Sequence, residues 1–204
     1  MNKRNYRREM DELVAALPPD GPRPKVLLHV CCAPCFSGCI ESLADWADVT
    51  LLFYNPNMDT AEEYRKRAVE LRRFCIDAKL PVEVVVEDFD PKPFYDLARG
   101  LENVPEGGER CFKCYELRMR EAAIYARDNG FDYFTTTLTL SPLKNAAKIN
   151  DIGEMLGAVY GVKHLPSDFK KKDGYKRSIE LSKEYNLYRQ NYCGCVYSRR
   201  DALA

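Results

Sequence analysis

The chain has 204 residues, 46% of them hydrophobic and 30% charged, so it can bury one core without disulfide cross-links. Basic and acidic residues number 31 each, and the zero net charge excludes the overall basic character of a protein that coats nucleic acid. No apolar signal segment or bilayer-length apolar run is visible, so we expect a cytoplasmic protein with no membrane partner. In a reducing compartment, the nine cysteines are expected to serve metal binding, catalysis or burial.

Residues 1–24 are predicted to form an N-terminal helical extension and a proline-rich linker. Apolar side chains recur at helical spacing from Tyr6 to Leu17, and the prolines of residues 18–24 then end the helix. Residues 25–204 are expected to form a single α/β catalytic domain, which closes with a C-terminal segment of helix and Cys-Gly-Cys.

Strands and helices are predicted to alternate through that domain. Short apolar or β-branched runs favour strands at residues 25–30, 49–54, 82–87 and 133–138. Helical patterns favour helices at residues 36–47, 60–78, 93–99, 115–128, 144–156 and 178–188, and Thr60 and Glu63 form a capping box. This order predicts a three-layer α/β sandwich with a mostly parallel sheet and a ligand crevice at the carboxyl ends of the strands.

Eight cysteines fall into three groups, which are Cys31, Cys32, Cys35 and Cys39; Cys111 and Cys114; and Cys193 and Cys195. The first group directly follows the first predicted strand, and the second lies at the start of a predicted helix, where the helix N-terminus favours thiolate. Two thiolates from each of these groups would form a four-thiolate site, which by ligand count suits zinc or an iron–sulfur cluster. The ninth, Cys75, lies beside the apolar stripe of a helix and is interpreted as a core residue.

The third group has a single glycine between its thiols. Cys193 and Cys195 can close a strained, redox-active disulfide ring because Gly194 supplies backbone freedom; otherwise they are further metal ligands. Cys32-Ala-Pro-Cys35 also matches a thioredoxin-like dithiol, but that motif needs neither a cysteine before it nor two further dithiols downstream. The roles of Cys35 and Cys39 stay open, since metal contact and simple burial both suit a helix.

Other polar motifs give weaker signals. The chain has no Gly-rich phosphate loop, and His29 inside the first strand is interpreted as a hydrogen-bonded core histidine. Local basic runs, including residues 65–67, 170–172 and 199–200, are each read as solvated surface unless they line a phosphate-binding face.

Five segments together resemble the cobalamin-independent epoxyqueuosine reductases, the QueH family, in order along residues 25–198. They are LLHVCCAPC from Leu27, ERCFKCYELR from Glu109, TTTLTLSPLKN from Thr135, DFKKK from Asp168 and LYRQNYCGCVYS from Leu187. The resemblance implies an adenine nucleotide alpha-hydrolase-like fold without its ATP-binding loop. It also implies the last step of tRNA queuosine synthesis, the two-electron reductive removal of the epoxide oxygen of epoxyqueuosine at the wobble position, giving queuosine and water.

Motif by motif, the resemblance implies that Cys31, Cys32, Cys111 and Cys114 ligate a [4Fe-4S] cluster and that Cys193 and Cys195 form the redox-active pair. An additional mononuclear iron stays open, as does the proton donor, for which the candidates are Tyr192, Tyr197, Asp168 and His29. The implied partners are an electron donor of unknown identity and the tRNAs for aspartate, asparagine, histidine and tyrosine. Their phosphates are expected to contact basic residues, namely Lys170 to Lys172, Arg177, Arg199 and Arg200.

Two other functions also suit parts of this sequence. A zinc-stabilised tRNA-binding or tRNA-thiolating protein on the same fold would use the same thiols as structural ligands. A thioredoxin-like dithiol reductase that acts on proteins would need no metal.

Overall fold

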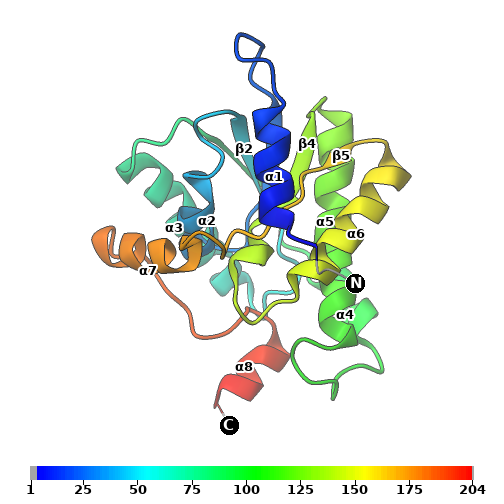
Figure 1. Ribbon diagram of the computed structural model, residues 1–204. Coiled ribbons are helices and arrows are strands. Elements are labelled where there is room, and N and C mark those ends of the chain that lie inside the picture. The colour runs from blue at the N-terminus through cyan, green and yellow to red at the C-terminus, as the bar shows by residue number, and fades with distance from the viewer. Residues whose placement is uncertain (1–3, 204) are drawn as a thin grey trace.

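The computed structural model describes residues 4–203, and within this range five strands form one sheet in which all neighbours are parallel (Figure 1). The strand order is β3-β2-β1-β4-β5. The strands are β1 (Lys25–His29), β2 (Asp48–Phe53), β3 (Glu83–Val86), β4 (Tyr133–Thr136) and β5 (Lys163–His164). The predicted α/β class and parallel sheet are confirmed, and β5 escaped prediction because two residues carry no periodic pattern.

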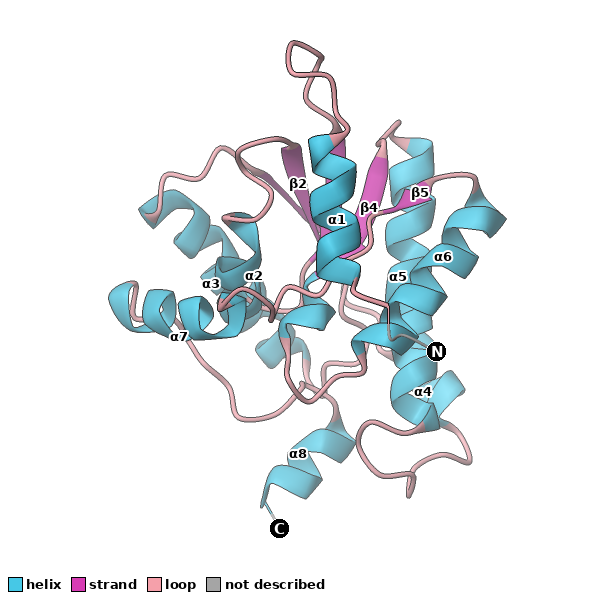
Figure 2. Cartoon of the chain, viewed as in Figure 1, coloured by secondary structure: helices cyan, strands magenta, loops and turns pink. Residues whose placement is uncertain are grey.

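Helices cover both faces of the sheet, as the colouring by secondary structure makes plain (Figure 2). One layer contains α1 (Tyr6–Ala15), α2 (Ala33–Ile40) and α3 (Ala61–Asp77), and the other contains α5 (Glu109–Asp128) and α6 (Ala146–Tyr160). The remaining helices are α4 (Lys92–Ala98), the 3-10 turn η1 (Thr137–Leu140), α7 (Gly174–Glu184) and α8 (Val196–Leu203). The three-layer sandwich is therefore confirmed, and none of the described helices is long and apolar enough to cross a membrane.

The central strand β1 is buried on both sides. Val26 and Leu28 pack toward the layer of α2 and α3, while Leu27 between them packs toward α5 and α6. All three are fully buried, which is why this strand appears in the sequence as a nearly continuous apolar run. Met10 of α1 joins the first of these clusters, and the division of the chain at residue 24 stays a prediction.

The boundaries of two helices differ from the prediction in a way that matters for the cysteines. α2 begins at Ala33 rather than at residue 36, because Pro34 suits the first helical turn, and it ends at Ile40 in a series of turns. α5 begins at Glu109 rather than at residue 115, so Cys111 and Cys114 both lie inside the helix. Both cysteine motifs thus start helices at the carboxyl edge of the sheet.

α7 is held against α2 by a pair of glycines. A Cβ on Gly38 would lie 2.5 Å from the carbonyl oxygen of Gly174 and 2.8 Å from the Cβ of Ser178, so only glycine permits this approach. The contact fixes the start of the C-terminal segment, which runs on from α7 along the carboxyl edge of the sheet to α8 (Figure 1).

His164 on β5 is half-buried, and both of its ring nitrogens are shielded from solvent. Its imidazole packs against Gly153 of α6, where a Cβ would come within 2.3 Å of the ring, and against the ring of Phe134. Neither ring nitrogen has a hydrogen-bond partner among residues 4–203, and burial of the ring lowers the pKa of His164 to about 4.

We therefore expect the free energy of unfolding to fall as the pH drops from 6.5 toward about 4. The unfolded chain protonates this histidine near pH 6.5, whereas the folded chain resists protonation until about pH 4, so acid favours the unfolded state. The loss is about 1.4 kcal/mol per pH unit from this group. Denaturant titrations near neutral pH and near pH 5 should show a smaller difference in His164→Leu than in the parent chain, and an equal difference would contradict the assignment.

Candidate functional site

Three thiols meet where β1 passes into α2. The sulfur atoms of Cys31, Cys32 and Cys35 all lie within 4.8 Å of one another, and those of Cys31 and Cys32 are 3.9 Å apart. Cys32 is the N-cap of α2 and has an extended backbone, with φ of −172° and ψ of 161°, so the chain bends between the two adjacent thiols. Cys35 then returns from the first turn of α2, and the three residues together could hold a metal ion.

The three thiols are electrostatically unequal. Hydrogen bonds from Cys32 and Cys35 lower the pKa of the Cys31 thiol well below its usual value, and Arg118 and Thr137 act in the same direction. The pKa of Cys32 is raised to about 12, first of all because its thiol donates to Cys31, and that of Cys35 is raised for the same reason. Cys31 is thus the thiolate around which its two neighbours are arranged.

Cys111 and Cys114 lie apart from that group, in the first turns of α5. Cys111 Sγ accepts a hydrogen bond from the backbone N–H of Gly107, at 3.3 Å. The two thiols line a small cavity of about 20 Å³ together with Cys193 and Cys195. Burial raises the pKa of Cys114 to about 12, although the nearby cation of Arg118 opposes that shift.

Cys193 joins the two thiol sites. It lines the small cavity and also a larger one of about 300 Å³, whose wall includes Cys31, Cys32 and Cys35. Glu106 and Lys144 line both cavities as well. All three sequence groups therefore reach one region beyond the carboxyl ends of β1 and β4, where a parallel sheet normally binds its ligand.

The Cys193–Cys195 segment is held by α3. Arg67, only 1% exposed, donates from Nη1 to the carbonyl of Cys193 at 3.1 Å and from Nε to Glu63 at 2.6 Å. The backbone N–H of Asp59 donates to the carbonyl of Gly194, at 2.8 Å. Gly194 has φ of +128°, and a Cβ there would lie 2.9 Å from Met58 Sδ and 3.3 Å from Arg67 Nη1. Both the conformation and the space require glycine.

The remaining cysteines serve the core. Cys39 is fully buried in the α2 layer, and its thiol donates to the carbonyl of Cys35 at 3.1 Å. Cys75 on α3 is 6% exposed and lies in the same cluster, as predicted. Of the two cysteines that the sequence left undecided, Cys35 therefore faces the thiol site and Cys39 faces the core.

The candidate proton donors are spread over different places. His29 is fully buried, with Nδ1 2.8 Å from Thr136 Oγ1 and Nε2 donating to the carbonyl of Tyr54 at 3.1 Å, and its pKa falls to about 3 through burial. Asp168 pairs with Lys170 at another cavity, of about 520 Å³. Tyr192 lines the larger thiol cavity, whereas the ring of Tyr197 packs against the Arg110 guanidinium.

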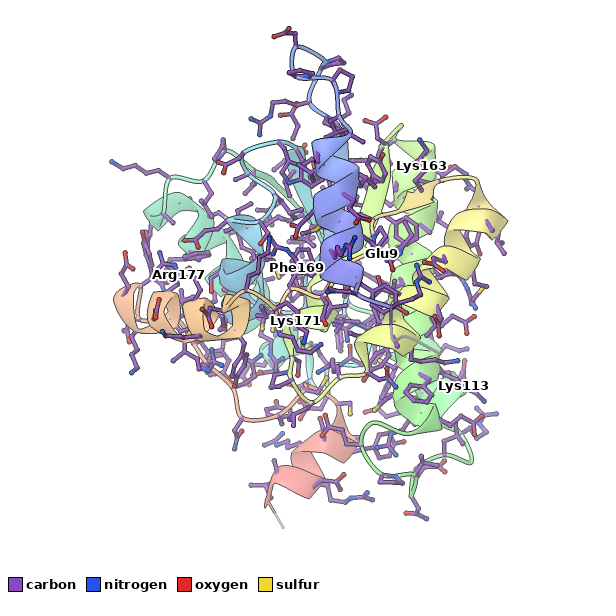
Figure 3. All side chains as sticks on the ribbon, viewed as in Figure 1. Glu9, Lys113, Lys163, Phe169, Lys171 and Arg177 are labelled. Atoms are coloured by element: carbon purple, nitrogen blue, oxygen red, sulfur yellow. The ribbon has the colours of Figure 1, made fainter. Side chains whose placement is uncertain are left out.

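Most of the basic residues expected to meet tRNA are engaged in ion pairs. Lys172 pairs with Asp11, and Arg177 pairs with Glu41 and Glu180. The C-terminal pair is also occupied, Arg199 by Asp59 and Arg200 by Asp201. Lys171 forms no ion pair with any residue in the range 4–203 and is exposed near the middle of the view in Figure 3.

Sequence reasoning missed the buried cations of the site. Arg67 and Arg118 are each 1% exposed, although both come from charged stretches that suggest a helix surface. Arg118 lies one helical turn after Cys114, and this i,i+4 spacing is the signal that could have identified it. Lys144 had a weaker signal, a single lysine between Pro142 and the N-cap Asn145 of α6.

The fold is a parallel α/β sandwich, and clustered thiols and buried cations lie together at the carboxyl edge of its sheet. These features define a thiol-based metal or redox protein. Comparison with known sequences makes this class specific. The family model described as "Epoxyqueuosine reductase QueH" matches residues 26–201, and the chain belongs to this family.

Relatives named "Epoxyqueuosine reductase QueH" agree with the family match. The protein from Streptococcus pyogenes serotype M1 is 44% identical over 97% of this chain and 79% of its own length. That from Staphylococcus epidermidis is 43% identical over 96% of this chain and 85% of its own length. A more distant relative from Thermotoga maritima is 36% identical over 85% of this chain and 89% of its own length.

The crowding around Gly194 leads to a prediction about the Cys193–Cys195 segment. Gly194→Ala should lower the stability by about 1–3 kcal/mol beyond its backbone strain, because the new methyl group meets Met58 and Arg67. The displaced segment should also expose Cys193 to faster alkylation. Gly130→Ala is the matched control, since Gly130 also has a positive φ, of +66°, but open space around its Cβ position. Equal losses of stability in the two variants would contradict the packing argument.

Proposed function

We propose that the protein is an epoxyqueuosine reductase that removes the epoxide oxygen of epoxyqueuosine at the tRNA wobble position, the last step of queuosine synthesis. The single observation that carries the proposal is the position of Cys193, which lines the cavities of both other thiol groups. The family match and the named relatives support the same reaction. A tRNA substrate and nine free thiols are consistent with a cytoplasmic enzyme.

The donor set fits an iron–sulfur cluster. We propose Cys31, Cys32, Cys111 and Cys114 as its ligands, and Cys35 is close enough to its neighbours to serve an additional mononuclear iron. Four thiolates on a [4Fe-4S] core leave a net negative charge, which needs cations and N–H donors nearby. Arg67 Nη2 and Arg118 Nε and Nη1 are such donors, buried and without hydrogen-bond partners among the described residues. When bound, the cluster supplies electrons one at a time.

The Cys193–Cys195 pair can supply the electrons and protons that removal of the epoxide oxygen consumes. Converting the epoxide to an alkene breaks two C–O bonds, forms one C=C bond and releases water, and this consumes two electrons and two protons. Oxidation of two thiols to one disulfide supplies the same two electrons and two protons. An external reductant, whose identity stays open, then restores the dithiol. Cys193 is half-buried beside the larger cavity and Cys195 is buried behind it, so we assign Cys193 the outer position.

The tRNA would present its wobble base to the larger cavity. A base flipped out of a loop is commonly held by stacking on aromatic rings, and Tyr192 lines this cavity. Lys144 and Arg189 also line this cavity and supply positive charge there. The ring of Tyr188 is already occupied by Lys66, whose Nζ lies 3.6 Å from the ring centre, so we assign the stacking role to Tyr192.

Single Cys→Ala variants test the proposed division of the thiols. After anaerobic reconstitution with iron and sulfide, variants at Cys31, Cys32, Cys111 and Cys114 should lose bound iron. Variants at Cys193 and Cys195 should keep the iron and lose nearly all turnover of epoxyqueuosine-containing tRNA with a reduced dye. Cys75→Ala should keep both, because Cys75 lies in the core.

Metal analysis of the parent chain separates this proposal from its rivals. Bound zinc without iron or sulfide would favour a zinc-stabilised tRNA-binding protein and overturn the proposed cofactor. Full reductase activity in metal-free protein would favour a dithiol reductase. Retained iron in Cys111→Ala would remove that residue from the ligand set.

Lys171 is the basic residue whose substitution should affect tRNA binding most directly, because no carboxylate in residues 4–203 pairs with it. Lys171→Gln should weaken tRNA affinity and reduce the slope of log K against log salt by about 1. Lys163→Gln is the matched control, because Lys163 starts β5 at the amino edge of the sheet, apart from Lys171 (Figure 3). Equal slopes in all three proteins would contradict a phosphate contact at Lys171.

A further inference from the structure

Arg118 is a buried cation with unused hydrogen-bond donors. It is 1% exposed on α5, and its Nη2 donates to Asn55 Oδ1. Asn55 is itself fixed by the hydrogen bond from its Nδ2 to the carbonyl of Val30, at 2.9 Å. Arg118 Nε and Nη1 are buried and have no hydrogen-bond partner within residues 4–203. Asn55 thus holds one nitrogen of the guanidinium, and two further nitrogens, Nε and Nη1, are left to donate to another acceptor.

Two of the cysteine groups lie close to this guanidinium: Cys114 comes one turn before Arg118 on α5, and Asn55 binds the carbonyl of Val30, the residue before Cys31. The pKa of Arg118 is raised above its ordinary value: burial opposes the charged form, but Cys114, Cys193 and Cys31 outweigh it. These three thiols belong to the three separate cysteine groups of the sequence. Arg118 forms no salt bridge with a carboxylate of the described chain, in contrast to Arg67, which pairs with Glu63. The thiolates of these groups are therefore the negative charges available to this buried guanidinium.

We propose that Arg118 is a positioning residue for the iron–sulfur cluster, which it holds by donating hydrogen bonds to its sulfur atoms and by supplying an uncompensated positive charge. This inference rests on the function proposed above and extends it. A positive charge and N–H donors stabilise the reduced form, which carries one more negative charge, over the oxidised form. Arg118 therefore raises the reduction potential of the cluster, so that a milder reductant suffices.

The experiment compares Arg118→Gln with Arg120→Gln in the full chain, reconstituted anaerobically with iron and sulfide. Arg120 lies two residues further along α5, is exposed and pairs with Glu116, so it provides the same substitution without the buried charge. The readouts are iron and sulfide per chain, the midpoint potential from a titration followed by electron paramagnetic resonance, and the thermal unfolding of the metal-free protein. None of them requires turnover.

We expect Arg118→Gln to shift the midpoint potential to a more negative value, or to abolish cluster loading in a folded chain, whereas Arg120→Gln matches the parent. Metal-free Arg118→Gln should unfold in one cooperative transition close to that of the metal-free parent, because the substitution removes the cost of burying the charge together with the thiol interactions that offset it.

Two results would overturn the inference. One is an unchanged potential in a loaded Arg118→Gln protein, and the other is a metal-free variant that is markedly less stable than the parent, which would make Arg118 a purely structural residue. If the parent chain takes up zinc, or no metal, the proposed iron–sulfur cofactor is wrong. That result is distinct from a failure of the Arg118 inference, because it is seen in the parent chain before any variant is made.

Discussion

The carboxyl edge of the sheet is organised by the need to compensate buried positive charge. Moving a guanidinium out of water costs several kcal/mol even after relaxation, so each buried arginine must have partners around it. Arg67 finds Glu63, the carbonyl of Cys193 and the ring of Tyr192, and thereby ties the C-terminal segment to α3. Arg118 donates a hydrogen bond to Asn55, and its remaining compensation is the negative charge of nearby cysteines. Arg67 therefore helps to determine where the third cysteine group lies.

Parallel topology makes this convergence possible. β1 and β4 are neighbours in register, His29 beside Thr136, so Cys31 emerges next to Thr137 and its backbone N–H donates to that hydroxyl at 3.3 Å. α5 approaches the same edge with its N-terminal turns, where the helix dipole favours thiolate. Both cysteine motifs thus deliver sulfur from the start of a helix, although one follows a strand and the other follows a loop with no side-chain cap.

How much the sequence could predict depended on whether a feature was local. An apolar run predicts strand β1, helical periodicity predicts α3, and turn chemistry predicts the glycine between Cys193 and Cys195. The structure has all three where the sequence places them. One half of the predicted capping box is present, because Thr60 Oγ1 accepts a hydrogen bond from the Glu63 N–H. The other half is not, because the Glu63 carboxylate binds Arg67 and Tyr188 instead of the Thr60 N–H. Burial of Arg67 was unpredictable, because residues more than a hundred positions away cover it.

The contrast between Cys35 and Cys39 shows how a short helix can assign two similar residues opposite tasks. Both lie on α2, yet Cys35 meets Cys31 and Cys32 while Cys39 is sealed in the core. Helical spacing would place residues four apart on one face, but α2 begins at the carboxyl edge of the sheet, so its first turn lines the cavity while its second turn packs among α3, η1 and α7. Position along the helix therefore decides what each thiol can do, because only the first turn extends past the carboxyl ends of the strands.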